Sequence, residues 1–145
     1  MNADTLRQPK QTARRAAPQR AAGTAATRLL LVEDDPLTTQ IFERALAREG
    51  YVIDVARDGM QAQRRIEEQT PSVIVLDLTL PVGSGADVVR ALRARGDAVP
   101  VLIVSGKQPW QSALTSEELA PGRWLTKPVK PRDLLDAVRG LLAGD

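Results

Sequence analysis

Neither cysteine nor histidine occurs among the 145 residues of the chain. Without cysteine there is no disulfide, no thiolate metal site and no cysteine nucleophile. Without histidine there is no Ser-His-Asp triad, no imidazole-bound metal and no phosphohistidine on this chain. Any chemistry must therefore come from carboxylate, hydroxyl and amine side chains.

Aromatic residues and long apolar runs are also scarce. Only 3 % of the residues are aromatic, whereas 43 % are hydrophobic, so the core must be built from aliphatic side chains. No apolar run approaches the roughly 20 residues that a membrane span needs. The basic N-terminus is not followed by the apolar stretch of a secretory signal. We therefore expect a cytoplasmic protein.

The charge divides the chain into two parts. Residues 1–28 hold six basic residues and one acidic residue, whereas the remainder holds 14 basic and 17 acidic residues. Residues 1–27 are rich in Ala and Arg and have almost no large apolar side chain, which predicts a disordered basic tail. The tail is either a weak electrostatic arm for nucleic acid or acidic lipid, or a solvated extension or misassigned start. Residues 28–145 are predicted to form one domain.

From residue 28 onward, short apolar runs alternate with helical patterns. Runs of this kind, apolar throughout, are typical of strands buried on both faces. The predicted strands are 29–32, 51–56, 73–76, 99–104 and 123–125. The first two predicted helices are 36–50 and 59–68, and the third carries Val88, Val89 and Leu92. A weaker fourth helix is predicted at about 109–119, and a fifth begins at residue 131. The alternation predicts an α/β fold, a doubly wound five-stranded parallel sheet with five helices.

Polar residues stand where four of these strands end. The first strand is followed by Glu33, Asp34 and Asp35, the third by Asp77, the fourth ends at Ser105, and the fifth stops just before Lys127. Ligands of such sheets bind outside the carboxyl ends of the strands, so these side chains are expected at one site. Asp35 stands before a proline and is also a predicted helix N-cap.

A group of carboxylates at one place indicates a bound cation, because like charges repel. Oxygen ligands without histidine or cysteine favour a hard cation, most simply Mg²⁺. Lys127 and Ser105 offer a positive charge and a hydroxyl to phosphate oxygens. A central carboxylate can itself act as the nucleophile and form an aspartyl phosphate.

Several segments together resemble the receiver domains of bacterial response regulators. They are LLLVEDDP at 29–36, GYVIDVARDGMQA at 50–62, VIVLDLTLPVGSG at 73–85, PVLIVSG at 100–106 and WLTKPV at 124–129. The resemblance covers about residues 28–143. It implies a flavodoxin-like sheet with strand order 2-1-3-4-5.

The resemblance also implies roles for the acidic residues. Asp77 is expected to be the phosphoryl acceptor. Glu33 and Asp34 are the expected acidic pair, in which Asp34 binds Mg²⁺ directly and Glu33 acts largely through water. The backbone carbonyl of Thr79 would complete the protein ligands.

Three further residues match positions that respond to phosphorylation in this family. Ser105 would be the switch hydroxyl, and Lys127 would pair with the phosphoryl group, with a cis bond between Lys127 and Pro128. Trp124 stands at the aromatic switch position and is expected to turn inward on activation. The alternative for Trp124 is a core or edge aromatic with no switching role.

The resemblance implies protein partners rather than a small-molecule substrate. The donor would be a sensor histidine kinase or a histidine phosphotransfer protein. A downstream protein would bind the face formed by the fourth helix, fifth strand and fifth helix. Because nothing follows residue 145, we expect a stand-alone receiver that is a phosphoacceptor and not an enzyme in the usual sense. It is expected to be a monomer or a phosphorylation-dependent homodimer.

The stretch from residue 106 to 122 departs from the usual pattern because it has no clean helical stripe. Trp110 and Leu114 there form an exposed patch for docking or dimerisation, or Trp110 merely packs over the fourth helix. Ser84 stands where many family members have an acid.

Three other functions remain open. A degenerate receiver would never be phosphorylated and would act as a constitutive interaction module. An aspartyl-phosphate phosphatase would need a second acid at the position of Thr79. A nucleic-acid binder would act through the tail, which lacks aromatic residues for stacking and recognised binding motifs.

Overall fold

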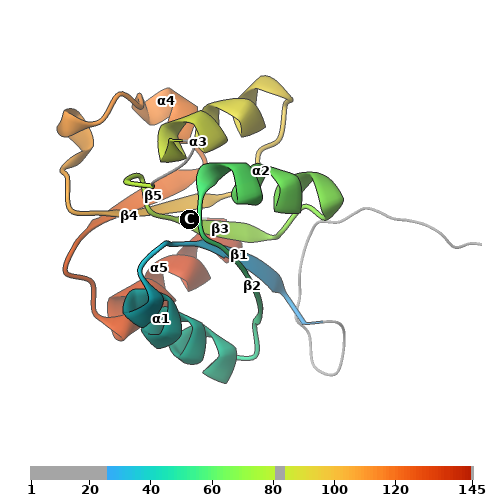
Figure 1. Cartoon of the computed structure of the whole chain (residues 1–145), viewed down its shortest axis with the longest axis vertical. Helices are drawn as coiled ribbons and strands as arrows, with labels where there is room; N and C mark the ends of the chain where they lie inside the picture. Colours follow the sequence, from blue (N-terminus) through green and yellow to red (C-terminus); the bar gives the residue numbers. More distant parts are fainter. Residues whose placement is uncertain (1–25, 81–83, 145) are drawn as a thin grey trace, which may run out of the picture.

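The computed structural model of the chain describes residues 26–80 and 84–144. In these residues one parallel sheet has the strand order β2-β1-β3-β4-β5, as the resemblance implied (Figure 1). The strands are β1 (Arg28–Val32), β2 (Val52–Ala56), β3 (Val73–Leu76), β4 (Val101–Ser105) and β5 (Gly122–Thr126).

Helices cover both faces of the sheet, so the predicted doubly wound α/β fold is confirmed (Figure 1). They are α1 (Pro36–Arg48), α2 (Gly59–Glu68), α3 (Gly85–Ala94), α4 (Ser116–Leu119) and α5 (Pro131–Leu142), with a 3-10 turn η2 (Pro109–Gln111) before α4. The apolar residues of α1 and α5 pack on one face, and those of α2 and α3 pack on the other.

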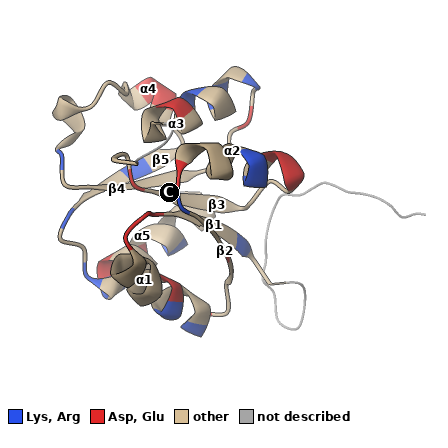
Figure 2. Ribbon diagram, in the orientation of Figure 1, with Lys and Arg blue, Asp and Glu red and all other residues tan. Residues whose placement is uncertain are grey.

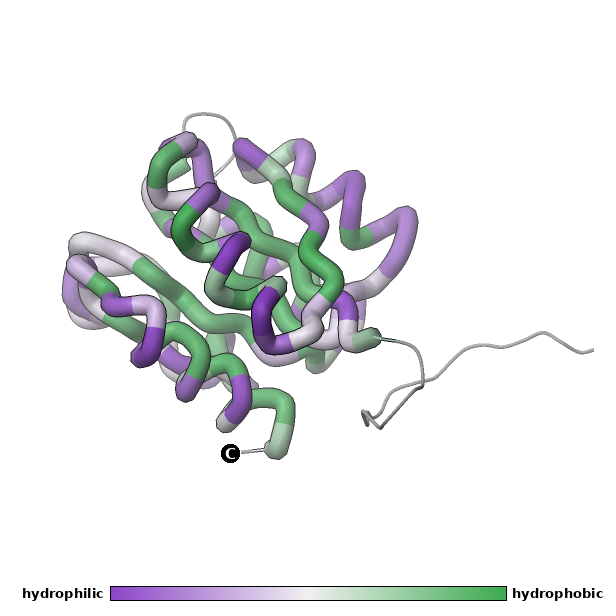
Figure 3. Tube along the Cα trace, turned by 90° about the horizontal axis from the view of Figure 1, so that it is seen from below, coloured by the Kyte–Doolittle hydropathy of each residue, from purple (hydrophilic) through white to green (hydrophobic). Residues whose placement is uncertain are grey.

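The central strands are buried on both faces because their apolar runs are unbroken. Leu29 and Leu31 point into the cluster under α1 and α5, whereas Leu30 and Val32 point into the cluster under α2 and α3. In Figure 3 the strands are hydrophobic along the middle of the molecule, between the two helical layers. This packing holds the strand ends in fixed relative positions.

Helix α1 begins where the sequence predicts. The side chain of Asp35 accepts hydrogen bonds from the backbone N–H of Thr38 at 2.8 Å and from its hydroxyl at 2.6 Å, so its predicted N-cap role is confirmed. Leu37 and Ile41 lie on the helical repeat but are 64 % and 44 % exposed. They form an apolar surface close to the start of the helix.

The fourth helix is short, as the missing helical stripe over 106–122 indicated, and it does not have the predicted span. Instead of one helix over about 109–119, the chain forms the 3-10 turn η2 and then the single turn α4. Thr115 and Glu118 close a capping box at the start of α4, and such a box begins a helix rather than continuing one. Ser112 and Thr115 favour local side-chain bonds that compete with helix, which explains the interruption.

Three stretches of the sequence fall outside the described residues. The predicted disordered tail lies there except for its last two residues, and so do the segment 81–83 and residue 145. Within residues 26–80 and 84–144, no helix is both long enough and apolar enough to cross a membrane.

Candidate functional site

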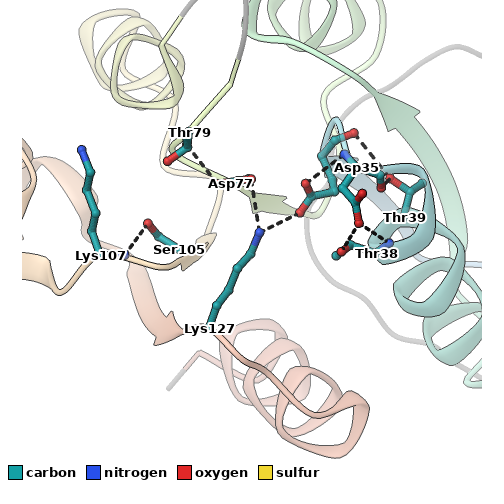
Figure 4. Close-up of polar contacts among 9 residues, drawn as sticks. Asp35, Thr38, Thr39, Asp77, Thr79, Ser105, Lys107 and Lys127 are labelled. Atoms are coloured by element: carbon teal, nitrogen blue, oxygen red, sulfur yellow. Dashed lines mark hydrogen bonds and ion pairs between the residues drawn. The ribbon is translucent and has the colours of Figure 1, made fainter.

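The polar residues that follow β1, β3 and β5 meet at one edge of the sheet (Figure 4). Glu33 follows β1, Asp77 follows β3 and Lys127 follows β5. The parallel pairing of these strands brings all their carboxyl ends to the same edge. Figure 2 shows acidic residues gathered where β1 leads into α1.

Both carboxylate oxygens of Asp77 are held in place, and the residue is 6 % exposed. Its Oδ1 accepts a hydrogen bond from the backbone N–H of Thr79 at 2.9 Å, and its Oδ2 lies 3.3 Å from the ammonium of Lys127. The start of α3 packs tightly behind it, since a Cβ on Gly85 would lie 2.8 Å from the Asp77 carbonyl oxygen. The carboxylate is therefore oriented rather than freely rotating.

Glu33 is almost fully buried, at 2 % exposure. Its Oε2 accepts a hydrogen bond from the backbone N–H of Asp35 at 3.2 Å, and its Oε1 lies 3.4 Å from the Lys127 ammonium. Burial raises the pKa of the Glu33 carboxyl above its usual value, and the nearby charge of Asp77 acts in the same direction. The bonds from Asp35 and Lys127 oppose this rise without cancelling it.

Lys127 bridges the two buried carboxylates (Figure 4). Burial on its own would lower the pKa of Lys127, but the charges of Asp77 and Glu33 outweigh it and hold that pKa above its usual value. The bond from Lys127 to Pro128 is cis, as the resemblance implied. The backbone N–H of Lys127 donates to the carbonyl of Ser105 at 2.7 Å, which ties the ends of β4 and β5 together.

The carboxylates form a group that suits a hard cation. Oxygens of Glu33, Asp34 and Asp77 lie within 4.8 Å of one another, and Asp34 is exposed. Lys127 supplies one positive charge against these three carboxylates, so negative charge remains in excess. An all-oxygen ligand set with excess negative charge fits Mg²⁺, as predicted. The predicted role of the Thr79 carbonyl stays a prediction.

Ser105 lies beside this group, but its hydroxyl bonds elsewhere. The residue is completely buried at the end of β4, and its Oγ accepts a hydrogen bond from the backbone N–H of Lys107 at 3.1 Å. Figure 4 shows Lys107 directed away from Asp77. The Ser105 hydroxyl proton is thus available to a group that arrives in front of Asp77.

Trp124 is connected to the same loop. Its indole N–H donates to the backbone carbonyl of Lys107 at 3.0 Å, and its half-buried ring packs against the core on the α2 and α3 side. Lys107 therefore links Ser105 to Trp124 through its two backbone groups. This link could not be predicted from the sequence, because both contacts use the main chain of Lys107 and leave no side-chain pattern.

Comparison with known proteins gives a consistent result. The family model described as the response regulator receiver domain matches residues 29–139. The chain is 34 % identical over 130 residues to the alkaline phosphatase synthesis transcriptional regulatory protein SphR of Synechococcus elongatus, covering 83 % of this chain and 51 % of that protein. It is 35 % identical over 120 residues to the transcriptional regulatory protein PrrA of Mycobacterium leprae, covering 83 % and 52 %. The chain thus spans about half the length of these curated relatives.

Solved structures agree with the fold. The chemotaxis response regulator CheY4 of Vibrio cholerae matches with a TM-score of 0.74 and 27 % identity, covering 81 % of this chain and all of that one. The receiver domain of the sensor histidine kinase PA1611 of Pseudomonas aeruginosa, solved with a magnesium ion coordinated in its active-site cleft, matches with a TM-score of 0.72 and 29 % identity. That match covers 83 % of this chain and all of that one.

Proposed function

Because this chain belongs to the family of response regulator receiver domains, we propose that it accepts a phosphoryl group on Asp77 and signals by phosphorylation-dependent protein binding. The observation that carries the proposal is the setting of Asp77. Its carboxylate is buried and oriented by the Thr79 N–H and the Lys127 ammonium, beside two further carboxylates. A nucleophile fixed in this way needs little reorganisation before attack.

The transfer is a single displacement at phosphorus. An Oδ lone pair of ionised Asp77 forms the new P–O bond, while the P–N bond of a donor phosphohistidine breaks and its electron pair returns to the imidazole nitrogen. The Lys127 ammonium lies 3.3 Å from Oδ2 of Asp77 and stays within reach of the phosphoryl oxygens. The absence of histidine from this chain fits a donor on another protein, either a sensor histidine kinase or a histidine phosphotransfer protein.

Asp34, Asp77 and the Thr79 carbonyl are the proposed direct ligands of Mg²⁺, and Glu33 would act through water. When bound, Mg²⁺ supplies charge neutralisation for the phosphoryl oxygens. The acidic group supports this assignment, because the Lys127 ammonium offsets only one of three neighbouring carboxylate charges.

Phosphorylation changes what Ser105 and Lys127 can bind. An aspartyl phosphate carries close to two negative charges at neutral pH and three acceptor oxygens. We expect the Ser105 hydroxyl and the Lys127 ammonium to bind these oxygens. Because the Lys107 N–H bonds the Ser105 Oγ, movement of Ser105 draws the loop toward the site and changes the contact with Trp124.

Two surfaces suit the partners. Leu37 and Ile41 are exposed near the start of α1, close to Asp34, and suit the donor protein that must reach Asp77. The predicted target face includes a hollow of about 270 Å³ between β5 and α5, lined in part by Leu125, Val129 and Ala137. Three points stay predictions: that the chain acts without an attached output domain, that it is cytoplasmic, and that it dimerises on phosphorylation. The division into a tail of residues 1–27 and a domain from residue 28 also stays a prediction.

The first experiment uses beryllofluoride, a mimic of the aspartyl phosphate. A Trp110→Phe variant leaves Trp124 as the single tryptophan. Its emission, excited where tyrosine does not absorb, is followed with Mg²⁺ and beryllofluoride, with and without Asp77→Asn. We expect a magnesium-dependent change that Asp77→Asn abolishes. Incubation with acetyl phosphate should add the mass of one phosphoryl group to the unsubstituted protein and none to Asp77→Asn. No fluorescence change and no added mass would instead identify a degenerate receiver.

A further inference from the structure

All five N–H groups of the Arg93 side chain on α3 donate to backbone carbonyls. A guanidinium has five such donors, so this one is fully used. The acceptors belong to two chain segments: Asp97 (2.8 Å), Val99 (2.9 Å), Glu118 (3.0 Å), Leu119 (2.9 Å) and Pro121 (3.2 Å). Arg93 thereby joins the end of α3 to the last two residues of α4 and to Pro121 in the turn before β5.

A second arginine on the same side of α3 strengthens this junction. Arg90, one turn earlier, donates from Nε to the carboxylate of Glu118 at 3.1 Å and from its other end to the carbonyl of Ala113 at 2.9 Å. Glu118 is also the capping-box residue of α4, so the same side chain fixes the helix start and its distance from α3. Figure 1 shows α4 lying beside α3.

The turn that follows α4 is packed without spare room. A Cβ on Gly122 would lie 2.6 Å from the carbonyl oxygen of Leu119 and 2.7 Å from that of Val101. Backbone atoms on both sides therefore confine Gly122, and the arginine contacts hold Glu118, Leu119 and Pro121 before it. We call residues 116–122 the α4 block.

The preceding residues, 106–112, are held differently. We call this segment the arm, and two side-chain hydrogen bonds join it to β5. The indole N–H of Trp124 donates to the Lys107 carbonyl at 3.0 Å. The hydroxyl of Thr126 donates to the side-chain oxygen of Gln108 at 3.4 Å. Neither bond involves a charged group. The arm carries Trp110, which is 80 % exposed.

We propose that Arg93 is a positioning residue that fixes the α4 block on α3, so that phosphorylation of Asp77 moves the arm and its exposed Trp110 while the α4 block stays in place. Movement of the block would strip three carbonyls from a half-buried guanidinium, which costs more than the loss of neutral bonds. Movement of the arm loses two neutral bonds and leaves Trp110 free to take a new position. The surface that changes for a partner is therefore the arm with Trp110.

This inference rests on the proposed phosphorylation of Asp77, and hydrogen exchange measured by mass spectrometry tests the two separately. The full chain is compared with and without Mg²⁺ and beryllofluoride. In the unsubstituted protein we expect a severalfold change in amide exchange over 106–112 and around Asp77, with none over 116–121. In Arg93→Lys, which cannot supply five donors, the beryllofluoride-dependent change should spread into 116–121.

Arg95→Lys is the matched control, since Arg95 is an exposed residue beyond the same helix whose carboxylate contact lies at 3.7 Å. It should behave like the unsubstituted protein. A purely structural role of Arg93 would speed exchange over 116–121 equally in both states, and this result would overturn the inference. A beryllofluoride-dependent change over 116–121 in the unsubstituted protein would overturn it as well. No response at any segment, including the surroundings of Asp77, would overturn the proposed function and with it the inference.

Discussion

The indole N–H of Trp124 bonds the backbone carbonyl of Lys107, whose own N–H bonds the Ser105 hydroxyl oxygen. An aromatic residue on β5 is thereby connected through Lys107 to Ser105, which lies beside the proposed phosphorylation site. The predicted aromatic switch is thus linked, through the backbone of Lys107, to the hydroxyl that would meet the phosphoryl group.

Replacement of Trp124 by Phe keeps an aromatic ring in the core and removes the N–H that holds Lys107. We expect the free energy of unfolding to fall by about 0.5–1.5 kcal/mol, the usual net value of one hydrogen bond. Amide exchange over 106–112 should become faster. Trp110→Phe is the control, because its ring is exposed and its loss should leave stability within about 0.5 kcal/mol. Equal effects of the two variants in urea unfolding would contradict this account.

The raised pKa of the Glu33 carboxyl predicts that the stability of the protein depends on pH. Its pKa is raised in the folded protein, mainly by burial, so the folded state binds this proton more tightly than the unfolded chain does. The contribution of Glu33 to stability is therefore greatest below the usual carboxyl pKa and is lost as the pH rises through the raised value. Glu33→Gln should stabilise the protein in EDTA at neutral pH, because it removes a buried charge beside Asp77.

The measurement for Glu33 is urea unfolding in EDTA between pH 4 and pH 8. The difference between the unsubstituted protein and Glu33→Gln should widen toward neutral pH. Glu43→Gln, an exposed carboxylate on α1, serves as the control and should show no such widening. A Glu33→Gln variant that is less stable at neutral pH would count against buried repulsion at the site.

Asp34 and Asp35 are neighbours with separable roles. Asp35→Ala removes the α1 cap to Thr38 and should cost about 1 kcal/mol of stability, as cap substitutions usually do. It should keep the rise in melting temperature that MgCl₂ produces, because the Asp35 backbone N–H still holds Glu33. Asp34→Ala should do the reverse, with unchanged stability in EDTA and no magnesium-dependent rise. Thermal unfolding with and without MgCl₂ tests both variants. If only Asp35→Ala lost the magnesium-dependent rise, Asp35 rather than Asp34 would be the magnesium ligand.

Gly85 is required by the close approach of α3 to the site. A Cβ there would lie 2.7 Å from the Cα of Leu78 and 2.8 Å from the Asp77 carbonyl oxygen, so the backbone must shift. Gly85→Ala should cost about 1–3 kcal/mol, in the range of overpacked cores. It should also slow labelling of Asp77 by acetyl phosphate. Gly106→Ala is the control, since a Cβ there meets nothing within 4 Å, and an equal loss in that variant would refute the steric explanation.

The sequence predicted the parallel sheet and the meeting of the polar residues because both depend on simple periodic features, whereas the strand order came from the resemblance to receiver domains. Unbroken apolar runs such as Leu29–Val32 fix buried parallel strands, and parallel strands bring the residues at their carboxyl ends to one edge of the sheet. The cap at Asp35 was predictable for a similar reason. An Asp directly before a Pro indicates the N-cap and first residue of a helix, and this signal depends only on neighbouring residues.

Other features depend on partners that are distant in the sequence. Arg93 bonds backbone carbonyls 25 to 28 residues away, and carbonyls occur at every position, so the side chain gives no indication of its acceptors. The helical repeat of α1 did not reveal that Leu37 and Ile41 stay exposed, because periodicity identifies a face but not the element that covers it. The break in the fourth helix came from a competition among local caps that propensity alone does not resolve.

The apolar surface of α1 has a consequence for how such a protein could diversify. Leu37 and Ile41 are side chains on a helix exterior, whereas Asp77 and Lys127 are fixed by strand ends in the interior. Substitutions at the first pair could alter which donor is accepted without disturbing the second pair. A duplicated gene could therefore acquire a separate donor, insulated from cross-talk with its parent, through a few surface changes while the reaction itself is inherited intact.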